Sequence, residues 1–189
     1  GHRAGLGSHE LSLLAAADAL SSLSGHRRQQ MWDAVARHTP PALLQEAPIA
    51  EPAVELPPAP EGEAIVWDHR STGLSLRRHP LALLRPQLQA RRLSTAAELA
   101  HAPDRRLVRH AGLVTLRQQP ETAGGVMFVT LEDETGVVQA IDCRSLRERY
   151  RRALMQSRLL AVHGVWQREG EVCSLIAGHL EDLTPLLGS

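Results

Sequence analysis

Apolar and polar side chains alternate most clearly in the second half of the chain. Residues 111–136 read AGLVTLRQQPETAGGVMFVTLEDETG, which is two alternating segments around a Gly-Gly pair, with an acidic turn closing the second. A period of two is typical of half-buried strands. The pattern therefore predicts two antiparallel strands that begin a curled sheet.

Further elements of the same half indicate the type of sheet. The sequence predicts a third strand at 137–143, an arginine-rich helix at 145–156, and two last strands at 159–168 and 171–177, joined at Glu169-Gly170. Three strands, one helix and two strands is the order of the OB-fold. This five-stranded Greek-key barrel often binds single-stranded nucleic acid.

The first half shows helical spacing instead. Short helices are predicted over 11–23 and 27–37, with Ser24-Gly25 as the break between them. Five prolines between residues 46 and 63 predict an extended, semi-rigid connector.

Two local signals mark further helices before the barrel. His79-Pro80 places proline at a first helical position. Thr95 with Glu98 three residues later forms a capping box. The predicted fold class is α+β, in four parts: a helical segment at 1–45, a Pro/Ala/Glu-rich linker at 46–63, a helical connector at 64–103 and an OB-fold domain at 104–189.

Charge is balanced overall but uneven along the chain. The 189 residues include 21 basic and 21 acidic side chains, so bulk charge does not indicate a nucleic-acid-binding protein. Every basic residue is an arginine. Residues 144–158 nevertheless carry six arginines against one acid, Glu148.

Few residues suggest chemistry. Cys143 and Cys173 fall in predicted strands and lack zinc-ligand spacing, so neither a disulfide nor a metal site is expected. The carboxylates of residues 132–134 could bind Mg2+, but hydrogen bonding within a turn is the favoured interpretation. Because no lysine-bearing phosphate loop occurs either, we predict no catalytic residue, no metal and no cofactor.

Membrane association is also not expected. No apolar run approaches the roughly 18 residues that cross a bilayer, and no signal segment opens the chain. A cytoplasmic location fits this pattern best.

A single-strand-binding surface would need cations for phosphates and rings on which bases stack. In the second strand Met127, Val129 and Leu131 are assigned to the core, which leaves Phe128 outside, and a bulge would reverse such faces. The two loops that flank the usual OB-fold binding face add further candidates. The predicted nucleic-acid contacts are Arg109, Arg117, Gln118, Phe128, Trp166 and Arg168.

The arginine-rich helix allows three interpretations. It could be a solvated face, a site for an acidic partner protein, or a contact for duplex phosphates. The candidate partner-binding residues are Arg144, Arg147, Arg151 and Arg152. In an OB-fold this helix lies away from the usual strand-binding groove, which weakens the DNA interpretation.

Three long segments also resemble a known family. They are WDHRSTGLSLRRHPLALLRPQL at 67–88, the segment at 111–136, and WQREGEV at 166–172. In this order they resemble the C-terminal region of bacterial error-prone DNA polymerases of the C family, the DnaE-like enzymes called ImuC. The resemblance covers most of the chain and is weakest at 46–63.

The resemblance implies a fold and a role. It implies that residues 1–45 are the end of a helix-hairpin-helix region, and that residues 64–103 pack helices on the outside of the barrel. It also implies a parent enzyme that extends DNA past lesions, with its catalytic carboxylates far upstream. The parent's implied partners are an inactive Y-family-like protein of the mutasome, a RecA-like accessory protein and the sliding clamp.

The expected function is therefore non-catalytic: positioning single-stranded template DNA, accessory mutasome proteins or both. The alternative is a purely protein-binding module with negligible DNA affinity. Zero net charge favours the alternative, and so do departures from the family pattern, such as Gly124 in place of a lysine and Asp142 in place of a valine before a tryptophan. A third possibility, a stand-alone DNA-binding protein, requires a natural start near Gly1.

Overall fold

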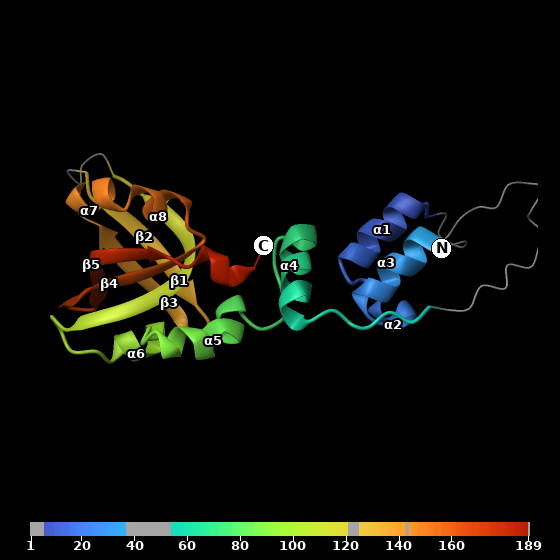
Figure 1. The fold of residues 1–189 in the computed structure, drawn as a ribbon, viewed down its shortest axis with the longest axis horizontal. Helices are drawn as coiled ribbons and strands as arrows, with labels where there is room; N and C mark the ends of the chain where they lie inside the picture. Colours follow the sequence, from blue (N-terminus) through green and yellow to red (C-terminus); the bar gives the residue numbers. More distant parts are fainter. Residues whose placement is uncertain (1–5, 37–53, 121–124, 143, 189) are drawn as a thin grey trace, which may run out of the picture. The chain divides into compact units, whose positions relative to one another are not determined.

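The computed structural model describes residues 6–36, 54–120, 125–142 and 144–188 (Figure 1). The chain divides into two compact units, Gly1–Arg77 and Arg78–Ser189. The first unit is helical and the second contains the sheet.

The described residues of the first unit form four helices: α1 (Ser8–Ala16), α2 (Ser21–Ser24), α3 (Arg27–Ala36) and α4 (Glu61–Thr72). The predicted break at Ser24-Gly25 is present, and Gly25 adopts a positive φ of 74°. The buried Gln30 side chain closes this turn by donating to the Gly25 carbonyl at 2.7 Å.

Helix α4 belongs to this unit, which divides the expected connector at 64–103. Arg27 of α3 pairs with Asp68 and donates to the Ala64 carbonyl at 2.8 Å. Arg28 pairs with Glu63 at 3.0 Å. These partners lie 35 to 41 positions apart in sequence, so periodicity along the chain did not reveal them.

The last part of the expected linker packs along α3. The Gln29 side chain accepts from the Leu56 amide at 3.0 Å and donates to the Val54 carbonyl at 3.1 Å. His26 donates to the Leu56 carbonyl at 2.7 Å. The linker residues before position 54 lie outside the described residues.

The second unit is a closed five-stranded barrel, which confirms the predicted α+β fold class with an OB-fold. The strands are β1 (Leu107–Gln118), β2 (Met127–Asp133), β3 (Gly136–Asp142), β4 (Leu159–Glu169) and β5 (Val172–Asp182). They close in the order β1-β2-β3-β5-β4, with β3 and β5 parallel. Helices α7 (Arg144–Arg149) and α8 (Arg151–Gln156) lie between β3 and β4 in sequence, where one unbroken helix was predicted.

Alternation along the strands produces the barrel interior. Met127, Val129 and Leu131 are buried inside it, as predicted. Because every second residue faces inward, β1, β4 and β5 contribute to the same cluster.

A second cluster covers the outside of the barrel. Leu81 and Leu88 of α5 (Pro80–Ala90) pack against Ala111, Leu159 and Ala161 of the sheet. This packing places α5 on the outside of the barrel. The 3-10 helix η3 (Thr184–Leu187) adds to the same cluster.

The predicted helix starts are also present. The His79 side chain accepts from the Leu81 amide at 3.1 Å at the start of α5. At the start of α6 (Ala96–Ala100), Thr95 and Glu98 form the full capping box.

A bulge in β1 reverses its faces. The pairing with β2 shifts register between Val114 and Leu116, so Thr115 is the extra residue. Val114 pairs with the interior residue Leu131, but after the bulge it is Arg117 that pairs with the interior residue Val129.

The close approach of β4 and β5 gives a stability prediction. A Cβ on Gly164 would lie 2.0 Å from the backbone oxygen of Ile176, whereas one on Gly178 would meet its nearest atom at 3.5 Å. Gly164→Ala should therefore lower the free energy of unfolding by about 1–3 kcal/mol or more in urea titrations. The control Gly178→Ala should change it by less than about 0.5 kcal/mol. Equal effects of the two variants would contradict the described β4–β5 pairing.

Candidate nucleic-acid interface

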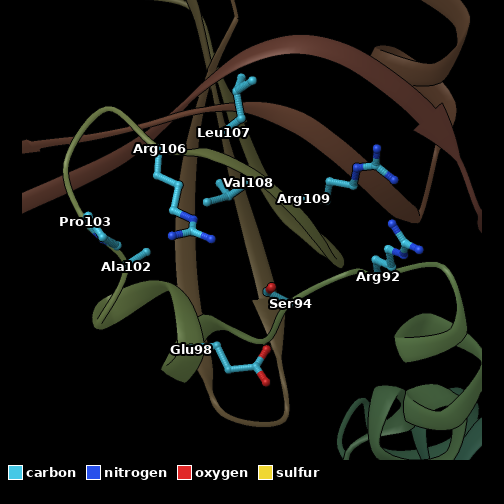
Figure 2. A pocket seen from close by; sticks show the side chains of 9 residues that line it. All are labelled: Arg92, Ser94, Glu98, Ala102, Pro103, Arg106, Leu107, Val108 and Arg109. Atoms are coloured by element: carbon cyan, nitrogen blue, oxygen red, sulfur yellow. The ribbon is translucent and has the colours of Figure 1, made fainter.

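A pocket of about 600 Å3 opens where β1 begins. Its walls come from the turn after α5, from α6, from the loop that follows α6 and from β1 (Figure 2). The lining residues are Arg92, Ser94, Glu98, Ala102, Pro103, Arg106, Leu107, Val108 and Arg109.

Three arginines make this pocket cationic. Arg92, Arg106 and Arg109 are all exposed, and Figure 2 shows Arg92 and Arg109 reaching the same side of the pocket from two elements. Their guanidinium groups form no hydrogen bond or ion pair with the residues that the structure describes. Guanidinium groups without internal partners are available to bind phosphate oxygens in a bidentate manner.

Glu98 is the one acidic residue in the lining. Its carboxylate accepts from the Thr95 amide at 2.8 Å in the capping box, so part of its hydrogen-bonding capacity serves α6. The remaining lining leaves the pocket with an excess of positive charge.

Backbone contacts hold the pocket wall against β1. The Ser94 amide donates to the Arg109 carbonyl at 2.8 Å, and His110 Nδ1 donates to the Ser94 carbonyl at 2.9 Å. Burial lowers the pKa of His110, so this imidazole is neutral at neutral pH. These contacts hold Ser94 beside β1, and the neutral imidazole of His110 adds no charge to the pocket.

The carboxylate of Asp133 fastens α6 to the β2–β3 turn. It accepts from the amides of Ala96 at 2.8 Å and Thr135 at 2.7 Å, and from Gly136 at 3.0 Å. Arg85 of α5 lies 3.4 Å away and pairs more closely with Glu134. One buried side chain therefore connects α5, α6 and the sheet.

The electrostatics of this cluster agree with its geometry. Burial raises the pKa of Asp133, but hydrogen bonds from Thr135 and Ala96 outweigh it, and the pKa lies below its ordinary value. The hydrogen bond to Glu134 raises the pKa of Arg85. Two of the three carboxylates at 132–134 thus serve the turn and its helices, which confirms the favoured interpretation of that acidic group.

The structure brings only some of the predicted nucleic-acid contacts near the pocket. Arg109 lines it. Arg168 lies close by, because its guanidinium donates to the Ala100 carbonyl of α6 at 2.7 Å. Gln118 is exposed at the far end of β1, and Phe128 is half-buried on the outside of β2.

Two predicted contacts are wrong. Trp166 is only 3% exposed and packs inside the barrel, so its ring is unavailable to a base. Arg117 is turned inward by the bulge, and its guanidinium donates to the carbonyls of Leu154, at 2.6 Å, and Ser157 at the end of α8. Burial lowers the pKa of Arg117, in keeping with a structural role.

Arg92 and Arg106 were missed by the sequence analysis. Arg92 follows α5 with a positive φ of 58°, and Arg106 precedes β1, so neither belongs to a periodic element. No local signal distinguishes them from other surface arginines, since the pocket depends on how α6 is fastened to the turn.

The candidate partner-binding arginines lie elsewhere. Arg147 donates to Gln119 at 2.6 Å, and Arg151 and Arg152 are exposed on α8. Arg144 begins α7, and its side chain lies outside what the structure describes. A second pocket of about 420 Å3 is lined by Gln119, Met127, Arg147, Glu148, Arg151 and Met155.

The described part of the chain contains no group of three His, Cys, Asp or Glu side chains that could hold a metal ion. Cys173 is a free, half-buried thiol, and Cys143 lies outside the described residues. Among the described helices, none is long and apolar enough to span a bilayer.

Comparison with known proteins identifies the relatives of the chain. It is 51% identical to an error-prone DNA polymerase of Ralstonia nicotianae over 99% of its length, and 53% identical to one of Burkholderia pseudomallei over 98%. It spans only 18% and 17% of these two relatives. No protein-family model matches the chain.

Similarity to solved structures is weak. Asparaginyl-tRNA synthetase from Pyrococcus horikoshii matches with a TM-score of 0.42 and 21% identity, over 48% of this chain and 22% of that chain. The Stn1-ten1 complex of S. pombe matches with a TM-score of 0.37 and 20% identity, over 48% of this chain and 70% of that chain. The fold assignment therefore rests on the barrel topology.

Asp133 should control the stability of the second unit at acid pH. Because its folded-state pKa is lowered, its contribution is fully present above about pH 5 and is lost as pH falls through the folded-state pKa. Asp133→Asn should lower the free energy of unfolding at neutral pH by about 1–3 kcal/mol and flatten this acid dependence, measured by urea titration across pH.

The control variant, Asp142→Asn, should change the free energy of unfolding in the opposite direction. Burial raises the pKa of Asp142, whose carboxylate has no hydrogen-bond partner among the described residues. Its charge therefore disfavours folding above its ordinary pKa, and Asp142→Asn should raise stability at neutral pH. The same sign for both variants would contradict the assigned role of Asp133.

A second pair of variants separates structural from free arginines. Arg117→Ala removes two charge-assisted hydrogen bonds from α8 and should cost about 1.5–3 kcal/mol of stability, measured by urea or thermal unfolding. Arg109→Ala removes an exposed guanidinium without an internal partner and should change stability by less than about 0.5 kcal/mol. A large loss at Arg109 would show that its side chain serves the fold.

Proposed function

We propose that this chain, which is homologous to one region of the error-prone DNA polymerases, positions single-stranded template DNA for its parent enzyme and transfers no nucleotide itself. The observation that carries the proposal is the pocket at the start of β1. There Arg92, Arg106 and Arg109 line one pocket, and their guanidinium groups have no hydrogen-bond or ion-pair partner among the described residues.

Positive charge remains uncompensated at the start of β1. Some other arginines of the second unit are used within the fold, such as Arg85 on Glu134 and Arg91 on Glu181, whereas Arg151, Arg152 and Arg158 are exposed on another surface. Guanidinium groups that line one pocket repel one another, and a polyanion relieves that repulsion while its phosphate oxygens accept their hydrogen bonds. DNA is the polyanion that a polymerase must hold, and the OB-fold is a common platform for its single-stranded form.

The carboxylates of this region also support the proposal that it transfers no nucleotide. Polymerase chemistry uses carboxylates that are free to hold metal ions beside the nucleotide. Asp133 accepts hydrogen bonds from three backbone amides, and Glu134 is paired with Arg85. Catalysis is therefore assigned to the larger part of the parent protein, since this chain spans less than a fifth of its relatives.

A second candidate function is protein docking at α7 and α8. The pocket there combines Arg147 and Arg151 with Met155, which is 50% exposed. Methionine adapts its shape to a partner, and the arginines favour an acidic one. Candidate partners are the inactive Y-family-like protein, the RecA-like accessory protein and the sliding clamp that the family resemblance implies.

Fluorescence anisotropy with labelled oligothymidine tests the first function. The unsubstituted chain should bind at about 50 mM salt and lose affinity as salt rises. Arg92→Ala, Arg106→Ala and Arg109→Ala combined should weaken binding about tenfold or more, and should reduce the slope of log affinity against log salt by about 2.

The matched control removes three exposed arginines from another surface, with Arg151→Ala, Arg152→Ala and Arg158→Ala combined. Both triple variants change the net charge equally, so only a local site distinguishes them. Equal losses would indicate bulk charge alone. No binding at low salt by the unsubstituted chain would contradict template positioning, and loss of a captured mutasome protein in the control variant would then favour docking.

A further inference from the structure

A row of cationic and ring side chains crosses the outer face of β1, β4 and β5. Arg109 pairs with His163 across β1 and β4, and His163 pairs with His179 across β4 and β5. These positions alternate with interior residues such as Val162 and Leu180, so the row faces outward. It begins at an arginine of the pocket described above.

The row continues onto the helices. The rings of His163 and His179 have centroids 5.2 Å apart, and those of His179 and Tyr150 are 5.1 Å apart and nearly perpendicular. The Tyr150 hydroxyl and His179 Nδ1 are hydrogen-bonded at 2.7 Å. Arg149 lies over the Tyr150 ring, 5.3 Å from its centroid. Three successive rings with an arginine at each end thus extend from β1 to the α7–α8 junction.

An apolar row runs beside it. Leu107 pairs with Val165, and Val165 pairs with Ile176, one outward position further along the same strands. Leu107 is 78% exposed, and the other two are half-buried. On the opposite side of the ring row, α5 covers the outward residues Ala111 and Ala161. The open strip therefore consists of one apolar row and one row of rings.

Charge on this strip favours an anion. Glu181, the acidic residue two positions after His179 on β5, is paired with Arg91 at 3.1 Å. Burial, Arg109 and His179 lower the pKa of His163, so its ring is neutral at neutral pH and offers an uncharged face. Unpaired arginines at one end and Arg149 at the other leave the strip positive.

We propose that a single strand of nucleic acid crosses the barrel on this β1–β4–β5 strip, with phosphates at the pocket arginines and bases against His163, His179 and Tyr150. The proposal rests on the proposed function and deepens it by naming the face that is used. Histidine and tyrosine rings are stacking partners for unpaired bases, and the apolar row extends that surface.

The face of β2 and β3 is less suited to the same strand. Among the described residues of β2 and β3, Phe128 is the one aromatic ring, while Trp166 lies in the interior and Arg117 is used at the end of α8. The outward neighbours of Phe128 on β1 and β3 are Gln118 and Ile141, which carry no positive charge. A strand on that face would have fewer cations and rings within reach.

The test compares variants on the two faces by anisotropy with oligothymidine of about 16 nucleotides. His179→Ala should weaken binding about fivefold or more, the change that corresponds to loss of one base stack. His179→Phe should restore most of the affinity because it restores a ring. Phe128→Ala on the β2 face should leave the affinity within about twofold. Since His179 is exposed, its variants are expected to fold, which circular dichroism would verify.

The outcomes distinguish the choice of binding face from the proposed positioning of template DNA. If Phe128→Ala weakens binding and His179→Ala does not, the strand uses the β2–β3 face, and this inference fails while template positioning stands. If the unsubstituted chain does not bind at about 50 mM salt, both fail. If polyglutamate of equal charge binds as tightly and shows the same loss in His179→Ala, the strip is a protein-docking surface and the inference also fails.

Discussion

The buried carboxylate of Asp133 is the interaction on which the second unit depends most. A buried carboxylate without hydrogen-bond donors is costly, and Asp133 meets this requirement with amides from both α6 and its own turn. The hydrogen bonds that Asp133 accepts therefore join α6 to the sheet. The same contact sets the path of residues 91–95, and that path places Arg92 and Ser94 opposite β1. The carboxylate thereby holds α6, which forms one wall of the cationic pocket, against the sheet.

The arginines divide into two groups that the net charge does not distinguish. Some hold segments together, as Arg27 does on Asp68 and Arg85 on Glu134. Acidic residues of the chain neutralise these structural arginines, and the overall charge of zero conceals the remainder. The remaining guanidinium groups include those at the start of β1 and those of Arg151 and Arg152 on α8. Zero net charge is thus compatible with a locally strong anion site, because binding depends on the nearby field.

The contrast between correct and incorrect predictions follows the range of the interactions involved. The order of the elements, the inward residues of β2 and the capping box at Thr95 were all predicted, because each depends on residues only a few positions apart. Arg117 was assigned to the wrong face because a single extra residue at Thr115 inverts everything after it. Helix α4 was placed with the barrel because its partner Arg27 is distant in sequence.

The sequence alone determined that the second half forms an OB barrel with an arginine-rich helical insertion and alternating strands. Those features arise from local periodicity and from caps that any window of the chain contains. Only the tertiary structure decided which arginines remain unpaired and which sheet face stays open beside them. Both depend on strand register, on one bulge and on ion pairs between distant segments, which are properties of the closed fold and have no local signal.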